Sequence, residues 1–241
     1  MSKSFGVVEE KLREADFFLK KFRTTTPLSY EGKFYFSAFV SAARSLTLSM
    51  QACMNGVDGF DDWYIEAVAR LRLNQLAPYF KEVRNDIIHT GVNPLNQIPI
   101  DHLREYLTQR LRSGNKEHFV IFDAGGETAQ ITEAVPACEN YFTSLVMMVF
   151  DCYQRFKKIV DPKWYFTEEN FLDHDKTIND AIIELGFPSF WLPADMDKSA
   201  AWPVIRRQQP SCQINDIFDQ YLGCVIPDPD DESGDDARER L

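Results

Sequence analysis

The amino-acid sequence predicts a mainly α-helical protein, and three observations support this fold class. Apolar residues recur at helical spacing over several long stretches, one of which spans residues 29–54. Hydrophobic residues make up 44% of the 241 positions and charged residues 26%, which is ordinary globular usage and sufficient for a sizeable core. Strand-like segments flank only Gly125-Gly126. We therefore expect an up-and-down helical bundle with a β-hairpin insertion and a carboxy-terminal extension rich in proline and aromatic residues.

The first helix is expected at residues 5–22 and the second at residues 29–54. Pro27 ends the first, because the residue before a proline is pushed out of the helical conformation. Asn55-Gly56 ends the second. The second helix has an apolar stripe at helical spacing, formed by Tyr35, Phe39, Ala42, Leu46, Met50 and Cys53. Small residues on a neighbouring face would allow another helix to approach closely.

A third helical region is expected from about Asp61, an acidic residue suited to a helix amino terminus, to His89. Pro78 marks either a kink or a new start within this region, and Thr90-Gly91 stops it. The elements expected next are a short helix at residues 101–112, a β-hairpin at about residues 117–133 and a long helix from Pro136 to about residue 160.

Residues 1–160 are expected to form the bundle, and the character of the chain changes after residue 161. Seven of the twelve prolines lie between Pro162 and Pro229. Short helices are expected near residues 168–185 and 214–222. We interpret residues 161–226 as an extension that wraps on the bundle, not as an independent domain, and residues 227–241 as a disordered acidic tail.

Charge and cysteine usage exclude several classes of protein. The net charge of −11 argues against a general nucleic-acid binder, which usually presents a basic face, so any contact with a polyanion would be local. No signal peptide is visible, and the most apolar stretch, residues 145–150, is too short to span a bilayer. The five cysteines lack zinc-binding spacing and suit reduced thiols. We expect a cytoplasmic protein with no membrane segment, metal or cofactor.

The clearest functional signal is a polar cluster at the end of the third helical region. On a helix with 3.6 residues per turn, the core-facing stripe consists of Leu76, Phe80, Val83 and Ile87. Asn85 and His89 are four residues apart and lie together on the opposite side, with Arg84 between that polar face and the stripe. A histidine, an amide and a guanidinium therefore gather on a surface that packing does not require to be polar.

These three side chains suit phosphodiester chemistry. Histidine exchanges a proton near neutral pH, and arginine offers a fixed fork of donors to phosphate oxygens and to charge that develops at phosphorus. Asn85 could hold the imidazole or a phosphate oxygen. Since no carboxylate cluster calls for magnesium, the chemistry indicated is metal-independent cleavage of RNA with its own 2′-hydroxyl as nucleophile.

Structural roles explain the same residues without any activity. A histidine in the last turn of a helix is favoured by the helix dipole, and an arginine beside an apolar stripe can lay its stem on that surface. The arginine-to-histidine spacing is also not unique, because Arg112 and His118 repeat it across a turn. A fourth histidine, His174, lies between two aspartates and fits either a weak cation site or a solvated loop.

The segment Arg84-Asn85-Asp86-Ile87-Ile88-His89 resembles the signature of the HEPN superfamily, an arginine, a polar residue, three further residues and a histidine. The resemblance implies a bundle of four or five helices that commonly dimerises and brings two motifs to a shared cleft. Many members are metal-independent ribonucleases of toxin–antitoxin, phage-defence or RNA-processing systems, and others are non-catalytic binding modules.

Carried over by position, the resemblance gives Arg84 and His89 catalytic roles and Asn85 a supporting role. The function expected is a metal-independent endoribonuclease that acts at a homodimer cleft, with RNA as substrate and an antitoxin or other protein as a further partner. The alternative is a non-catalytic module that binds a protein or a nucleotide. The hairpin near residues 119–131 and the extension after residue 161 depart from the minimal bundle of the superfamily.

Overall fold

The structure is a computed structural model that describes residues 5–25, 29–95, 120–123, 130–188, 191–192 and 197–231. Contacts divide the chain into two compact units, one formed by Val7–Met148 and the other by Met1–Gly6 with Val149–Leu241. Helices dominate the described residues of both, so the predicted fold class is confirmed at the level of a mainly helical bundle.

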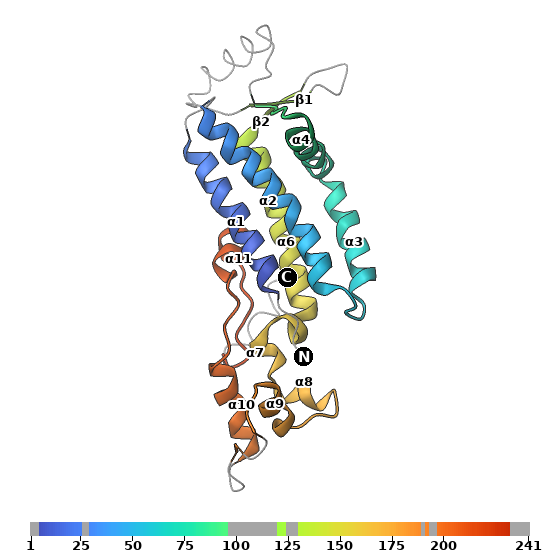
Figure 1. The fold of residues 1–241 in the computed structure, drawn as a ribbon, viewed down its shortest axis with the longest axis vertical. Coiled ribbons are helices and arrows are strands. Elements are labelled where there is room, and N and C mark those ends of the chain that lie inside the picture. The colour runs from blue at the N-terminus through green and yellow to red at the C-terminus, as the bar shows by residue number, and fades with distance from the viewer. Residues whose placement is uncertain are drawn as a thin grey trace. The chain divides into compact units, whose positions relative to one another are not determined.

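The first unit is a bundle of long helices (Figure 1). Its helices are α1 (Gly6–Thr24), α2 (Tyr30–Met54), α3 (Phe60–Leu73), α4 (Leu76–Thr90) and the first part of α6 (Ala134–Val160). In Figure 1, α1, α2 and α6 run alongside one another, and α3 and α4 follow on one side. The first two helices lie where the sequence predicts them. Ser29 caps α2, since its hydroxyl accepts a hydrogen bond from the N–H of Gly32 at 3.1 Å.

Phe80 on α4 lies at the centre of the bundle core. Its ring is 1% exposed and contacts rings from two other helices. Its ring centroid lies 6.3 Å from the ring centroids of Phe36 and Phe39 on α2. The ring also stacks on Tyr141 of α6, with 4.8 Å between the centroids. Aromatic pairs of this kind add to the free energy gained from burying apolar area. The apolar stripe of α4 therefore ties this helix to α2 and α6.

The third helical region consists of two separate helices, so Pro78 marks a new start and not a kink. Asn74 separates α3 from α4, and its side-chain oxygen accepts a hydrogen bond from the N–H of Leu76 at 3.0 Å. Its amide donates to Asn140 at 2.8 Å and to Ser144 at 2.9 Å, both on α6. Pro78 then falls in the first turn of α4, where a missing N–H costs no helical hydrogen bond.

Two short strands precede α6. Strand β1 (Val120–Asp123) pairs with β2 (Gln130–Glu133) in antiparallel register, with Val120 opposite Glu133 and Asp123 opposite Gln130. Residues 124–129, which join the strands, lie outside the described residues, as does the short helix expected at residues 101–112. A complete hairpin insertion at about residues 117–133 therefore stays a prediction.

The second unit has an apolar cluster of its own. It contains the end of α6, α7 (Pro162–Tyr165), α8 (Glu168–Leu172), α9 (Ile178–Glu184), α10 (Lys198–Arg207) and α11 (Asn215–Leu222). The buried cluster includes Tyr165, Phe171, Ile182, Trp202 and Ile205. The unit begins within α6 and not at residue 161. Wrapping of residues 161–226 on the bundle stays a prediction.

Helices α8, α9 and α11 lie within the ranges predicted from sequence, whereas α7 and α10 were not predicted. Helix α10 was missed because Pro203 lies inside it, and proline normally interrupts a helix. Trp202 and Ile205 on this helix are buried in the cluster, and Asp197 caps its start through a 3.0 Å hydrogen bond from the N–H of Ser199. Packing and capping therefore outweigh the proline.

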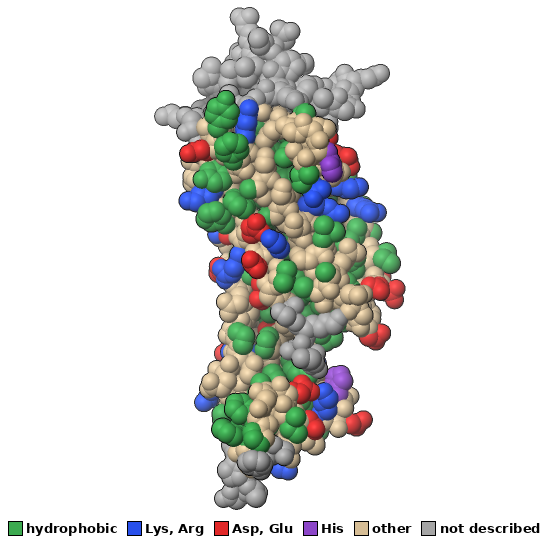
Figure 2. Space-filling model, viewed as in Figure 1, with side chains coloured by type: hydrophobic (Ala, Val, Ile, Leu, Met, Phe, Trp, Pro, Cys, Tyr) green, Lys and Arg blue, Asp and Glu red, His purple; other side chains and the backbone are tan. Residues whose placement is uncertain are grey.

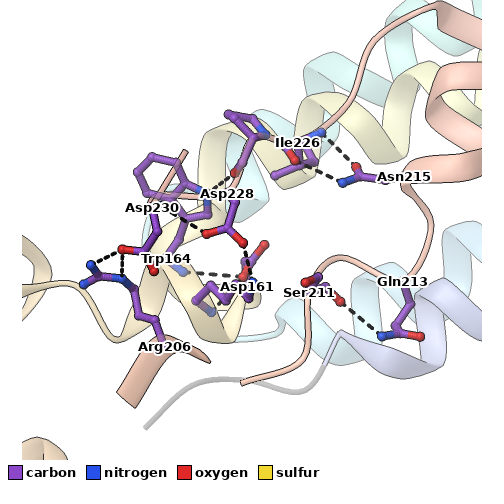
Figure 3. A network of polar contacts seen from close by, with 11 residues as sticks. Asp161, Trp164, Arg206, Ser211, Gln213, Asn215, Ile226, Asp228 and Asp230 are labelled. Carbon is purple, nitrogen blue, oxygen red and sulfur yellow. Dashed lines mark hydrogen bonds and ion pairs between the residues drawn. The ribbon is translucent and has the colours of Figure 1, made fainter. Parts of the chain in front are cut away.

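A short segment at residues 226–231, here called the C-terminal strap, is held by polar contacts (Figure 3). Asn215 pairs with the backbone of Ile226, accepting from its N–H at 2.8 Å and donating to its carbonyl at 3.0 Å. The indole N–H of Trp164 donates to the carbonyl of Pro227 at 2.9 Å. Two strap carboxylates form the ion pairs Asp228–Lys163 and Asp230–Arg206.

These contacts correct the expected start of the disordered tail. Charge and prolines predict that residues 227–231 belong to that tail, yet their carbonyl and carboxylate groups accept hydrogen bonds from donors on α7 and α10. Residues 232–241, the rest of the predicted tail, lie outside the described residues.

No helix in the described ranges has both the length and the apolar character needed to cross a bilayer. None of the five cysteines, all of which lie in the described ranges, forms a disulfide, and Cys138 and Cys152 are buried. Burial raises the pKa of both thiols, so these two side chains pack as small apolar groups.

Candidate functional site

The residues singled out by sequence lie on the last two turns of α4. The helix ends at Thr90, and Gly91 follows in the left-handed conformation at φ 71°, which a glycine adopts at no steric cost. Thr90 also donates its hydroxyl to the carbonyl of Asp86 at 2.7 Å. The helix therefore holds Arg84, Asn85 and His89 at a defined terminus, as the sequence predicts.

Arg84, Asn85 and His89 are more exposed than the residues on the core side of α4. Phe80 and Val83 are buried, whereas Arg84 and Asn85 are half-buried and His89 is exposed. Within the described part of the chain, no hydrogen bond or ion pair engages the side chains of Arg84, Asn85 or His89. The polar groups of these three residues can therefore meet a ligand or another protein.

The structure brings Asn85 and His89 together more closely than Arg84 and His89. Asn85 and His89 are one turn apart on the same side of α4. Arg84 precedes His89 by five residues, which corresponds to about 140° around the helix axis. A single α4 thus presents the guanidinium and the imidazole in different directions.

A pocket of about 550 Å³ lies in the same unit, against the amino-terminal half of α4. The first turns of α4 line it together with α2, α3 and α6. Its lining residues are Arg44, Thr47, Gln51, Tyr64, Val68, Leu71, Arg72, Ala77, Pro78, Lys81, Glu82 and Tyr141. Three of them are cationic, and Figure 2 shows lysine and arginine side chains gathered over α3 and α4. We call this cavity the basic pocket.

Arg44 places a positive charge beside two tyrosines of the basic pocket. Its guanidinium donates to the hydroxyl of Thr47 at 2.6 Å, and the hydroxyl of Tyr64 donates to the carbonyl of Thr47 at 3.2 Å. Burial raises the pKa of Tyr64 and raises that of Tyr141 to about 12, while the charge of Arg44 acts against both shifts. The charge of Arg72 also acts to lower the pKa of Tyr64.

Sequence reasoning missed the basic pocket. Its cations come from three successive helices, α2, α3 and α4, and each helix by itself shows only ordinary charged residues. The one available signal was Arg44, a charged residue in the middle of the most apolar part of α2.

His174, the one other histidine among the described residues, adds no site. The Nδ1 of His174 lies 2.7 Å from the carbonyl oxygen of Asn170, and neighbouring Asp173 pairs with Lys158 at 3.0 Å. His102 and His118, and with them the second arginine-to-histidine spacing, lie outside the described residues. Where the structure is described, no three His, Cys, Asp or Glu side chains lie close enough together to hold a metal ion.

No protein-family model matches the chain, and comparisons with curated proteins and with solved structures also found no match.

Proposed function

We propose that the chain is a metal-independent endoribonuclease with a HEPN-like bundle, whose active site forms where the α4 ends of two copies meet. Arg84 and His89 are the catalytic residues and Asn85 supports them. We base the proposal on the end of α4, where an exposed imidazole, an amide and a guanidinium gather within two turns and make no polar contact with other described residues. The resemblance of the same residues to the HEPN signature supports it.

The reaction needs only an acid, a base and a positive charge. A base takes the proton of the RNA 2′-hydroxyl, the 2′-oxygen forms a bond to the adjacent phosphorus, and the bond from phosphorus to the 5′-oxygen breaks. An acid protonates the departing 5′-oxygen, which leaves a 2′,3′-cyclic phosphate and a 5′-hydroxyl. His89 exchanges these protons, and Arg84 binds the phosphate oxygens as negative charge builds up on them.

Dimerisation would solve the geometric problem posed by one helix. Because Arg84 and His89 are about 140° apart around α4, they do not face one phosphate from a single helix face. A two-fold axis beside the helix end places a second Arg84 and a second His89 in the same cleft. Ile88 and Val92 are apolar side chains 49% and 42% exposed at this end, and they could be buried in such an interface.

Cleavage of a single-stranded RNA in the presence of a chelator tests the proposal. We expect a 2′,3′-cyclic phosphate product and no cleavage of DNA, which lacks the nucleophile. His89→Ala should lower the rate by about 100- to 10,000-fold, and Arg84→Ala by a comparable factor. His174→Ala is the matched control, because it removes an imidazole from the other unit. Equal rates for His89→Ala and the parent would refute the catalytic role.

Ile88 and Val92 also support a second candidate, a non-catalytic module that binds another protein through the end of α4. The two candidates predict different results in the same assay. An enzyme cleaves RNA and loses that activity with His89, whereas a binding module shows no cleavage that depends on Arg84 or His89. In that case an antitoxin-like or other protein partner would occupy the surface in place of RNA.

A further inference from the structure

The basic pocket lies against the first turns of α4, apart from the helix end that carries His89. Its lining combines apolar side chains with cationic ones. Val68 and Leu71 of α3 and Ala77 and Pro78 of α4 supply apolar surface, together with the rings of the two tyrosines. Arg44, Arg72 and Lys81 supply positive charge from three different helices.

The positive charges of the basic pocket are only partly balanced. Glu82 is the one carboxylate among its lining residues, and it lies 3.9 Å from Lys81 with both side chains exposed. Such an exposed pair neutralises little charge in water. No described carboxylate lies within ion-pair distance of Arg44 or Arg72. A surplus of two positive charges in a chain of net charge −11 is a local exception to the acidic character of the protein.

We propose that the basic pocket binds a small phosphate monoester with a flat apolar body. The volume of about 550 Å³ lies in the range of small-molecule sites. A phosphate dianion matches the surplus of two charges better than a carboxylate monoanion does, and guanidinium groups bind phosphate through paired hydrogen bonds. The apolar body lies between α3 and α4. The inference does not depend on RNA cleavage, because none of its residues belongs to the proposed catalytic set.

Titration of the isotope-labelled full chain with 1-naphthyl phosphate, followed by nuclear magnetic resonance, tests the proposal. We expect saturable shifts at backbone groups of residues 44–51, 64–72 and 77–82 and a dissociation constant on the order of 1 mM or below. 1-Naphthol has the same ring and no charge, and 1-naphthoate carries a single charge. Both should bind more weakly than the phosphate.

Three substitutions locate the site and its charge preference. Arg44→Gln and Arg72→Gln should each weaken binding of 1-naphthyl phosphate by about tenfold, the usual effect of losing a charged hydrogen bond. Arg70→Gln is the matched control, since Arg70 is an exposed arginine of α3 that does not line the pocket. Arg72 is exposed, so its replacement leaves the core intact and stays informative even if Arg44→Gln unfolds.

Each other outcome overturns a defined part of the proposal. Absence of saturation, shifts confined to other helices, or unchanged affinity in Arg72→Gln would mean that the basic pocket is not the site. Equal binding of 1-naphthol would refute recognition of charge, and equal binding of 1-naphthoate would refute the preference for phosphate. Loss of RNA cleavage in His89→Ala has no bearing on any of these results.

Discussion

At the scale of single residues, α4 has one side that packs in the core and one side that is exposed. Phe80 and Val83 are buried and connect the helix to its neighbours, whereas His89 is exposed. This division decides how activity measurements on variants are interpreted. A substitution on the exposed side should alter activity without lowering stability, whereas one on the buried side should lower the stability of the fold on which any activity depends.

Phe80→Ala should therefore lower stability strongly, and His89→Ala should hardly change it. Phe80→Ala removes a ring that contacts Phe36, Phe39 and Tyr141, and we expect the free energy of unfolding to fall by about 3–5 kcal/mol. His89→Ala should change it by less than about 0.5 kcal/mol, because the side chain is exposed. Urea denaturation followed by circular dichroism measures both. A loss above about 1 kcal/mol in His89→Ala would show that the imidazole has a structural role.

At the scale of elements, periodicity and terminators predicted the helices of the bundle. Asn55-Gly56 and Thr90-Gly91 end α2 and α4 as expected, because their backbone conformations are local properties of the sequence. The position of Asn85 and His89 on one side of α4 followed from helix geometry alone. Helix α10, by contrast, contains a proline that local rules treat as a terminator, and its stability depends on packing of Trp202 that only the folded chain provides.

The C-terminal strap gives a prediction at the same scale. A chain that ends at residue 226 loses the acceptor for Trp164 and the ion pairs of Asp228 and Asp230, and we expect its free energy of unfolding to fall by about 1–2 kcal/mol. That loss corresponds to a melting temperature lower by a few degrees. A chain that ends at residue 231 keeps every one of these contacts and is the matched control. Equal melting temperatures for the two chains would show that the strap contributes nothing.

The stabilisation from the strap should also depend on pH. Burial by itself would raise the pKa of Asp228, but the hydrogen bonds from Lys163 and from the N–H of Asp230, with the charges of Lys163 and Arg206, lower it overall. A carboxyl group with a lowered pKa stabilises the fold above its unfolded pKa and loses that effect as pH falls through the folded pKa. The difference between the two truncated chains should therefore shrink on acidification below about pH 4. A difference that grows on acidification would contradict the assignment.

At the scale of the whole molecule, the division into two units was the feature least accessible from sequence. Composition changes at Pro162, so the boundary was expected near residue 161, but the compact unit begins at Val149 within α6. A helix gives no local signal where its packing partners change. The same reason hid the basic pocket, since Arg44, Arg72 and Lys81 become neighbours only when three helices pack. Local signals predicted elements and the end of α4, whereas sites formed between elements required the structure.

Helix α6 carries a buried thiol in each unit, Cys138 in the first and Cys152 in the second, so the chain contains its own pair of reporters of local opening. Alkylating reagents attack the thiolate, and burial suppresses that form at both cysteines. With peptide mass spectrometry as the readout, both should react more slowly than the half-buried Cys212. Because each unit has its own core, we expect Cys138 and Cys152 to become reactive at different rates. Identical rates over a range of urea concentrations would mean that the two units open as one.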